Sequence, residues 1–212
     1  MRRLFSWIKS KPEFNSASYW ESRYKNQGTS GAGSYGRLAQ YKADVINKLA
    51  KDQNITQALE FGSGDGNQCS LFSFTKYTGV DVSWEVINRC RDRFSEVPEW
   101  LFYHISEPEV KTIQSPLVLS LDVIFHLVED DIFDKYMHQI FRSSTQFALI
   151  YSSDSESPNS AKHVRHRKYS DWISRNRKDF RLIQSWENPF AMIKNSDPDQ
   201  TSFAQFKLFS RT

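Results

Sequence analysis

The chain is poor in cysteine. Its 212 residues include only Cys69 and Cys90, and neither lies in a CxxC pair or in a cluster of cysteine and histidine ligands. So few thiols exclude a disulfide-stabilised secreted fold, and they favour the reducing cytoplasm as the location of the protein.

The chain also lacks long apolar stretches. The longest, 116–128, is interrupted by Asp122 and His126 and is shorter than the about 20 residues that span a bilayer. The first residues are basic and lack the apolar segment of a secretory signal. Because residues 1–11 mix Arg and Lys with Leu, Phe, Trp and Ile, we expect a short helix packed on the domain, with a membrane surface or a protein partner as the alternative.

Neither sign of charge is in large excess. The chain has 28 Lys and Arg residues against 25 Asp and Glu residues, a formal net charge of +3. This charge is too small to predict a nucleic-acid partner. The 16 Phe, 9 Tyr and 6 Trp residues exclude a disordered chain, and the length suits a single domain over 1–212.

Glycine is scarce but clustered. Only 8 residues are Gly, about half of the usual ~7%, and most of them fall in the two windows 28–36 and 62–66. Glycine is needed where the backbone adopts positive φ or passes close to a ligand. The two windows are therefore the first candidates for a binding site.

The second window joins two predicted strands. The apolar segment 57–61 contains Glu60 and enters the turn Gly-Ser-Gly-Asp-Gly at 62–66, after which 69–74 is expected to begin a helix. The next predicted strand, 77–82, carries Asp81 near its end. An acid at that position can accept hydrogen bonds from both hydroxyls of a ribose.

The acid-x-Gly-x-Gly-x-Gly motif at 60–66, followed by Asp81 at the end of the next strand, resembles the class I S-adenosylmethionine-dependent methyltransferases. The resemblance implies that Glu60 orients the amino-acid end of the cofactor and that Asp81 binds its ribose. It also implies that the backbone of Gly62, Ser63 and Gly64 passes the homocysteine portion closely. Many members place an acid against the adenine after the third strand, whereas this chain offers Ser106 or the backbone there.

The rest of the chain fits this architecture. Seven strands are predicted, with helical patterns between the first five, at 55–61, 77–82, 100–105, 117–125, 147–152, 180–186 and 203–210. Alternating strands and helices form a parallel sheet with right-handed crossovers, and the family ends in an antiparallel hairpin. We therefore expect an α/β fold, with a Rossmann-like, mostly parallel seven-stranded core over 54–212, an antiparallel last strand, and an N-terminal helical cap or lid over 1–53.

The first glycine window belongs to the predicted cap. It lies between the aromatic segment 19–24 and an amphipathic pattern over 38–49. A glycine-rich loop flanked by aromatic residues can close over a cofactor and exclude water, and Arg23 is a candidate partner of the cofactor carboxylate. The segment 19–36 resembles the cap of a methyltransferase subset found in bacterial and viral glycan clusters.

The fourth predicted strand supplies two candidate catalytic residues. In the family, the end of this strand adjoins the transferable methyl group, and here it carries Asp122 and His126. A sugar hydroxyl needs a base or a metal to withdraw its proton, and neutral His126 suits the role of base, whereas an amine needs no strong base. Asp122 is expected to orient the acceptor, or to bind Mg²⁺ or Mn²⁺ together with Glu129 or Asp130.

A basic segment follows the fifth strand. Residues 162–168 read Lys-His-Val-Arg-His-Arg-Lys, and His163, Arg165 and His166 are candidates for holding a polar or anionic acceptor. The glycan-cluster subset carries a similar run after its fifth strand, which favours a saccharide acceptor. The sequence contains no RNA-binding module and no aromatic platform of the kind that binds single strands, so we do not expect a nucleic-acid acceptor.

The sequence therefore predicts a methyltransferase that uses S-adenosylmethionine to O-methylate a sugar hydroxyl of a glycan, with glycosyltransferases as its expected partners. Two alternatives stay open. One is N-methylation of a small amine or a nucleic-acid base. The other is a regulatory subunit that binds the cofactor without chemistry.

Overall fold

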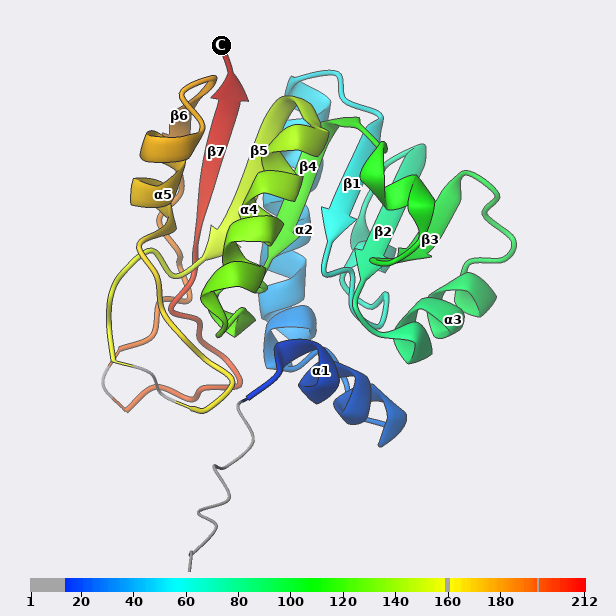
Figure 1. Cartoon of the computed structure of the whole chain (residues 1–212), viewed down its shortest axis with the longest axis horizontal. Coiled ribbons are helices and arrows are strands. Elements are labelled where there is room, and N and C mark those ends of the chain that lie inside the picture. Colours follow the sequence, from blue (N-terminus) through cyan, green and yellow to red (C-terminus); the bar gives the residue numbers. More distant parts are fainter. Residues whose placement is uncertain (1–13, 159–160, 194) are drawn as a thin grey trace, which may run out of the picture.

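The computed structural model describes residues 14–158, 161–193 and 195–212. Seven strands form one sheet in the order β3-β2-β1-β4-β5-β7-β6 (Figure 1). Their bounds are β1 Gln57–Phe61, β2 Lys76–Asp81, β3 Trp100–His104, β4 Ser115–Leu121, β5 Ser144–Ser152, β6 Phe180–Ser185 and β7 Gln205–Arg211. The helix expected for the first residues lies outside the described part of the chain.

The pairing of the strands confirms the predicted sheet. Strands β1 to β5 are mutually parallel, and β7 runs antiparallel to both β5 and β6. The parallel strands therefore end at the same edge of the sheet, which lies at the bottom of Figure 1. Ligands of open parallel sheets bind at this edge, near the point where the strand order reverses between β1 and β4.

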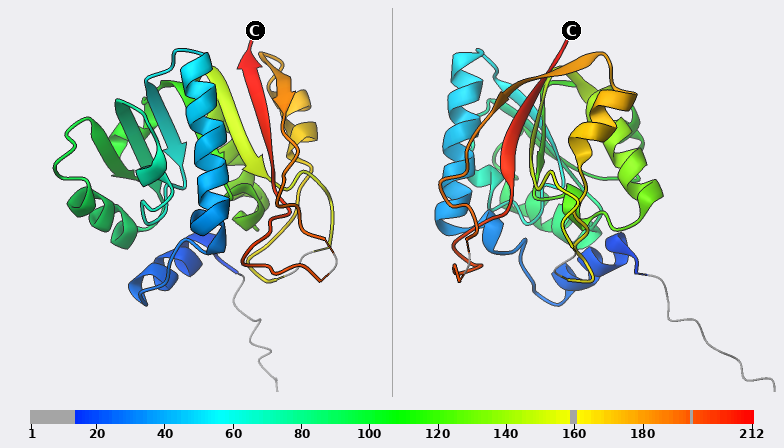
Figure 2. Two further views of the ribbon diagram at one scale, coloured as in Figure 1. Left: turned by 180° about the vertical axis from the view of Figure 1, so that it is seen from behind. Right: turned by 90° about the vertical axis from the view of Figure 1, so that its left-hand side faces the viewer.

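Helices cover both faces of the sheet (Figure 2). One face carries α2 (Gly36–Asp52) and α3 (Trp84–Arg93), and the other carries α4 (Asp130–Ser143) and α5 (Tyr169–Asn176). The short helix α1 (Ser16–Lys25) lies below the carboxyl-terminal edge. Among the described residues, none of the helices combines the length and the apolar character needed to cross a membrane.

Helix α2 forms because its apolar side chains recur at helical spacing. Leu38, Ile46 and Leu49 are at most 5% exposed and face the sheet, while Gln40 and Lys48 face solvent. Burial of each such aliphatic side chain contributes about 1.5–3 kcal/mol. This helix therefore anchors the cap to the core of the sheet, as the pattern over 38–49 predicts.

Two predicted connections are wrong. The glycine turn is followed by a single 3-10 turn (Cys69–Leu71) instead of a helix, and β3 is joined to β4 by another (Pro108–Lys111). The segment 69–74 is not needed to cover the sheet, because α2 occupies that face and packs with Cys69 and Phe72 in the same core. The apolar residues of 69–74 indicate burial, which a short turn satisfies equally well.

The fourth strand is shorter than predicted. It ends at Leu121, and Asp122 follows in the left-handed backbone region with φ +59. A 3-10 turn over Ile124–His126 then leads to α4. The apolar run continues past the strand because Ile124 and Phe125 are buried within the turn.

Candidate active site

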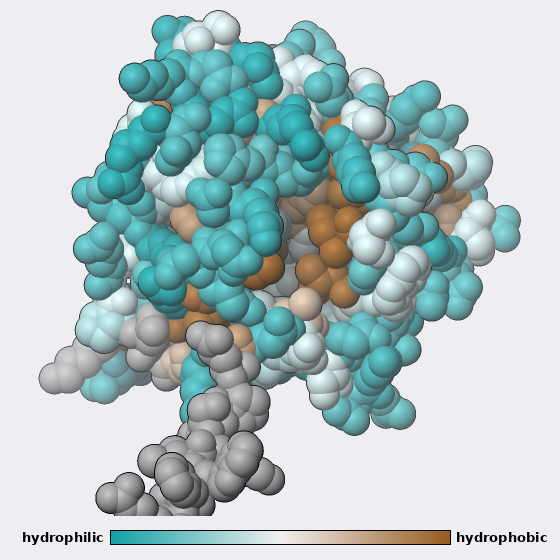
Figure 3. All heavy atoms as spheres, in the orientation of Figure 1, coloured by the Kyte–Doolittle hydropathy of each residue, from teal (hydrophilic) through white to brown (hydrophobic). Residues whose placement is uncertain are grey.

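A cavity of about 440 Å³ opens at the carboxyl-terminal edge of the sheet, within the size range of small-molecule sites. The tips of β1, β2 and β4 form its floor, and residues of α1 and α4 form its walls. Figure 3 shows the molecule hollowed between α4 and β3, with hydrophobic residues gathered around the hollow. Five residues of the predicted cofactor set line this cavity: Glu60, Gly62, Ser63, Gly64 and Asp81.

The turn after β1 requires glycine at two positions. Gly62 has φ +85 and Gly64 has φ +57, values that other residues adopt at a cost. A Cβ atom at Gly62 would overlap the side chain of Val123, and one at Gly64 would overlap the hydroxyl of Ser30. The backbone is therefore the surface that this turn presents to a ligand.

Glu60 is almost completely buried beneath the turn, with 1% of its surface exposed. Its Oε2 accepts a hydrogen bond from the hydroxyl of Tyr77 on β2. Burial disfavours the carboxylate and raises the pKa of Glu60 to about 7, although the Tyr77 hydrogen bond and the charge of Lys42 act in the opposite direction. A cationic ligand group beside Glu60 would complete the stabilisation of its charge.

Asp81 closes the same turn from the neighbouring strand. Its Oδ2 accepts the backbone N–H of Gly64 at 3.0 Å, and its Oδ1 accepts that of Ser83 at 3.0 Å. Burial raises the pKa of Asp81, and these backbone hydrogen bonds partly offset the rise. The carboxylate therefore both fixes the glycine turn and lines the cavity.

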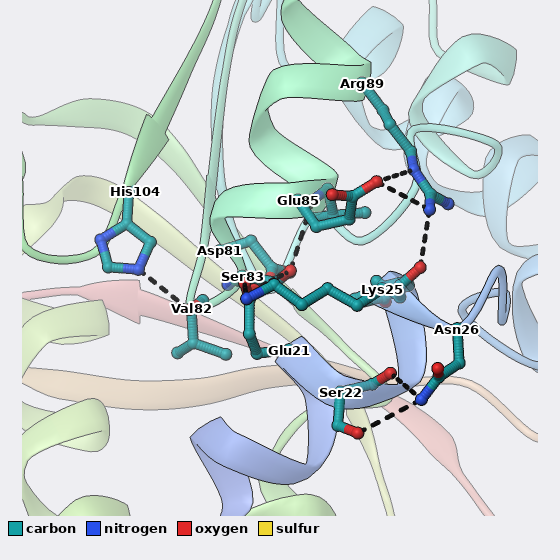
Figure 4. Close-up of polar contacts among 12 residues, drawn as sticks. Glu21, Ser22, Lys25, Asn26, Asp81, Val82, Ser83, Glu85, Arg89 and His104 are labelled. Carbon is teal, nitrogen blue, oxygen red and sulfur yellow. Dashed lines mark hydrogen bonds and ion pairs between the residues drawn. The ribbon is translucent and has the colours of Figure 1, made fainter.

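Helix α1 lines the cavity and is attached to the domain at two points. At its start, the backbone N–H of Ser16 donates to Glu129 at 2.8 Å, and the Ser16 hydroxyl donates to the carbonyl of His126 at 2.9 Å. Farther along, the carboxylate of Glu21 accepts from the hydroxyl of Ser83 at 2.6 Å, just beyond β2 (Figure 4). The helix is therefore fixed along one side of the cavity.

The first glycine window packs directly on the second. The N–H of Ser30 and the hydroxyl of Tyr35 both donate to Asp65 at 2.8 Å, and the N–H of Asp65 donates to Ser30 Oγ at 2.9 Å. Asn67 donates to the carbonyl of Ser34 at 2.7 Å. The loop predicted to close over a cofactor thus lies against the glycine turn.

Asp122 forms an ion pair with a buried lysine. Its Oδ2 lies 2.6 Å from Nζ of Lys42, and the Lys42 side chain is 1% exposed. The acids expected to help it bind a metal are engaged elsewhere, Glu129 with Ser16 and Asp130 with two arginines. Nowhere in the described ranges do three His, Cys, Asp or Glu residues come together as metal ligands, so these residues do not fit the predicted Mg²⁺ or Mn²⁺ site.

His126 lines the cavity on the side of α1, where its ring meets Trp20 edge to face at 4.9 Å. Its Nδ1 lies 2.9 Å from the carbonyl oxygen of His163. Because a carbonyl only accepts, Nδ1 carries the proton and Nε2 of the neutral ring is an acceptor. Burial lowers the pKa of His126 to about 4, so the neutral form prevails at physiological pH.

The predicted acceptor-binding residues do not line the cavity. The ring of His163 stacks on Tyr19 of α1 at 4.9 Å, and His166 is hydrogen-bonded to Ser153 at 2.7 Å. Arg165 donates to the carbonyl of Val128 at 2.8 Å and pairs with Asp130 at 3.1 Å. The basic segment is therefore bound to the start of α4.

Two further predicted cofactor residues lie outside the cavity lining. Nε of Arg23 donates to the carbonyl of Thr29 at 2.7 Å. The hydroxyl of Ser106 pairs with Nδ1 of His104 at 2.6 Å, and Nε2 of His104 donates to the carbonyl of Val82 (Figure 4). Their expected contacts with a cofactor stay predictions.

The sequence reasoning missed Lys42 and Tyr77, and it assigned Trp20 no role in ligand binding. Lys42 lies on the buried face of α2, where a lysine interrupts an otherwise apolar stripe, and that interruption is a signal that sequence alone contains. Tyr77 begins an apolar strand and carries no comparable signal. Its role follows only from the pairing of β1 with β2.

No protein-family model matches the chain, and no curated protein matches it. Solved structures do match. They include the N-methyltransferase NodS from Bradyrhizobium japonicum WM9 in complex with S-adenosylhomocysteine, with a TM-score of 0.68 at 11% identity over 93% of this chain and 99% of that one. The fold is that of the class I methyltransferases.

Two other structures agree with this result. Magnesium protoporphyrin IX methyltransferase (ChlM) from Synechocystis PCC 6803 with bound S-adenosylmethionine has a TM-score of 0.64 at 12% identity, covering 96% of this chain and 100% of that one. The methyltransferase domain of bacterial CtHen1-C has a TM-score of 0.63 at 17% identity, covering 82% and 99%. The predicted class I methyltransferase fold is thus confirmed.

Proposed function

We propose that this protein transfers a methyl group from S-adenosylmethionine to a sugar hydroxyl of a glycan. The cavity beside the glycine turn, with the buried carboxylates of Glu60 and Asp81 in its wall, carries the proposal. Glu60 would bind the ammonium group of the cofactor, and Asp81 its ribose hydroxyls. Structures of the same fold with bound S-adenosylmethionine and S-adenosylhomocysteine support this choice of cofactor.

His126 supports a hydroxyl acceptor over an amine. When bound, the cofactor supplies an electrophilic methyl group on a positively charged sulfur. Transfer would join a lone pair of the acceptor oxygen to this carbon while the bonding pair of the carbon–sulfur bond goes to sulfur, so the chain's own residues must orient the oxygen and take up its proton. Nε2 of His126 takes up the hydroxyl proton, because Nδ1 is already committed to the carbonyl of His163.

Helix α1 supplies an aromatic surface beside this base. Trp20 lies on α1, lines the cavity and contacts the ring of His126. The polar residues Asn15, Ser16 and Glu129 line the same region. We propose that the apolar face of a sugar ring packs on Trp20 while its hydroxyl groups meet the polar residues.

The proposal places the reaction in the cytoplasm, where both buried thiols, Cys69 and Cys90, stay free. It includes glycosyltransferases as partners and excludes nucleic acid as the acceptor.

The test incubates the protein with S-adenosylmethionine and a panel of oligosaccharides, small amines and oligonucleotides, and measures S-adenosylhomocysteine formation. Product with saccharides alone supports the proposal, and product with another class contradicts it.

Replacement of Trp20 by alanine should raise the KM for the saccharide about fivefold, since stacking on an aromatic ring is worth about 1 kcal/mol beyond area burial. The dissociation constant for S-adenosylhomocysteine should change less than about twofold, a shift worth only a few tenths of a kcal/mol. Trp20→Phe keeps an aromatic face and should recover most of the affinity. Loss of cofactor binding with an unchanged KM would instead make Trp20 a structural residue of α1.

A further inference from the structure

Glu60 differs from the other acids around the glycine turn in having only one donor. Asp81 accepts two backbone N–H groups, and Asp122 pairs with Lys42. Glu60 accepts a hydrogen bond from the Tyr77 hydroxyl, and no Lys or Arg of the described residues forms an ion pair with it. A ligand with a cationic group beside this carboxylate would supply the positive charge that these Lys and Arg residues do not place there.

The ring of Tyr77 is tightly packed, which keeps its hydroxyl beside Glu60. The side chain is 1% exposed, and its ring contacts Trp100 at 4.9 Å, Phe102 at 5.8 Å and Phe72 at 6.0 Å. The parallel pairing of β1 with β2 fixes its backbone. The hydroxyl is therefore a preorganised donor that selects one orientation of the carboxylate.

The charged and titratable groups around Glu60 come from every element packed against it. They are Lys42 of α2, Cys69 of the turn after β1, Tyr77 and Asp81 of β2, Cys90 of α3, Asp122 after β4 and Tyr136 of α4. Burial raises the pKa of Glu60 to about 7, and the Tyr77 hydrogen bond acts to lower it. Burial therefore brings the pKa of Glu60 close to neutral pH.

We propose that Tyr77 is a positioning residue for cofactor recognition, whose hydroxyl holds Glu60 toward the cavity so that its carboxylate receives the ammonium group of the ligand. The inference rests on the proposed function of this site. When the ammonium group binds, Glu60 gives its proton to the solvent, and the carboxylate and ammonium form an ion pair. Affinity for ligands with an amino-acid end therefore increases as Glu60 ionises.

Isothermal titration calorimetry of the full chain tests this with two nucleosides. S-adenosylhomocysteine carries the amino-acid end, and 5′-methylthioadenosine lacks it. For the wild-type protein, the affinity for S-adenosylhomocysteine should increase about eightfold between about pH 6 and pH 7.5, as expected for one group with a pKa near 7. The affinity for 5′-methylthioadenosine should stay constant over the same range.

Tyr77→Phe removes the hydroxyl and leaves the ring. We expect about tenfold weaker binding of S-adenosylhomocysteine at neutral pH, the size of one lost hydrogen bond to a charged group, and a pH dependence displaced to higher pH. Binding of 5′-methylthioadenosine should be unchanged. The matched control is Tyr169→Phe, since Tyr169 is equally buried and its hydroxyl has no partner among the described residues.

Equal weakening of both nucleosides by Tyr77→Phe, or an unshifted pH dependence, would overturn the inference and leave Tyr77 a structural residue. Should this variant not fold in a thermal melt, Glu60→Gln serves instead. It retains the Tyr77 contact, and its binding of S-adenosylhomocysteine should lose the pH dependence. Failure of the wild-type protein to bind either nucleoside would refute the proposed function itself.

Discussion

Replacement of Asp81 by alanine should weaken the binding of S-adenosylmethionine about a hundredfold. The change removes the two acceptors that hold the N–H groups of Gly64 and Ser83, and with them the proposed acceptor of the ribose hydroxyls. Hydrogen bonds to a charged group contribute about 1.5–3 kcal/mol each, and about 3 kcal/mol corresponds to a hundredfold or more in Kd. Calorimetric titration measures the change directly.

The experiment must separate ribose binding from support of the turn. An analogue of S-adenosylhomocysteine without the ribose hydroxyls should bind the wild-type protein weakly. Its affinity should fall little further in Asp81→Ala, because the analogue and the variant each remove one side of the same hydrogen bonds. Asp92→Ala is a suitable control, since Asp92 is exposed on α3 and outside the cavity lining. An unchanged Kd for S-adenosylmethionine in Asp81→Ala would refute the ribose role.

Replacement of His126 by alanine should lower kcat for a saccharide acceptor by about 10²–10⁴-fold, the usual contribution of a general base. The reason is that Nε2 of His126 is the base proposed for the hydroxyl proton, while the carboxylate of Asp122 is paired with Lys42. Cofactor affinity should be nearly unaffected. The readout is the rate of S-adenosylhomocysteine formation at saturating substrates.

His138→Ala provides the matched control, because the His138 side chain is 54% exposed on α4 and lies outside the cavity lining. Turnover that survives in His126→Ala would instead favour an amine acceptor, which needs no base. A wild-type protein that binds the cofactor but methylates none of the acceptor classes would be a regulatory subunit.

His126 should also contribute to the loss of folding stability at acidic pH. Burial lowers the pKa of His126 to about 4, so the base stays neutral well below its usual value of about 6.5. The unfolded chain takes up a proton at His126 below about pH 6.5, whereas the folded protein does so only near pH 4; stability is therefore lost as the pH falls through this window. In His126→Gln this part of the acid sensitivity should disappear from urea unfolding curves.

The sequence by itself determined the sheet and one side of the cavity. The pattern around Glu60 and Asp81 is local, since each acid belongs to a short apolar strand and the glycines lie between them. Parallel strands joined by right-handed crossovers end at a common edge. The order of these residues along the chain is therefore enough to bring them together, and the cavity lining includes both.

Only the tertiary structure decided which charges stay available to a ligand. Lys42 pairs with Asp122 across 80 residues, Ser16 binds Glu129 across 113, and Arg165 and Arg167 reach back to Asp130. Such contacts depend on how α1, α2 and the basic segment pack on the ends of the strands, and no periodicity along the chain encodes them. These cations and acids look like ligand-binding groups in the sequence but pair with one another in the fold. For Lys42 and Asp122 the physical reason is burial, because a charge withdrawn from water is stabilised by an opposite charge beside it.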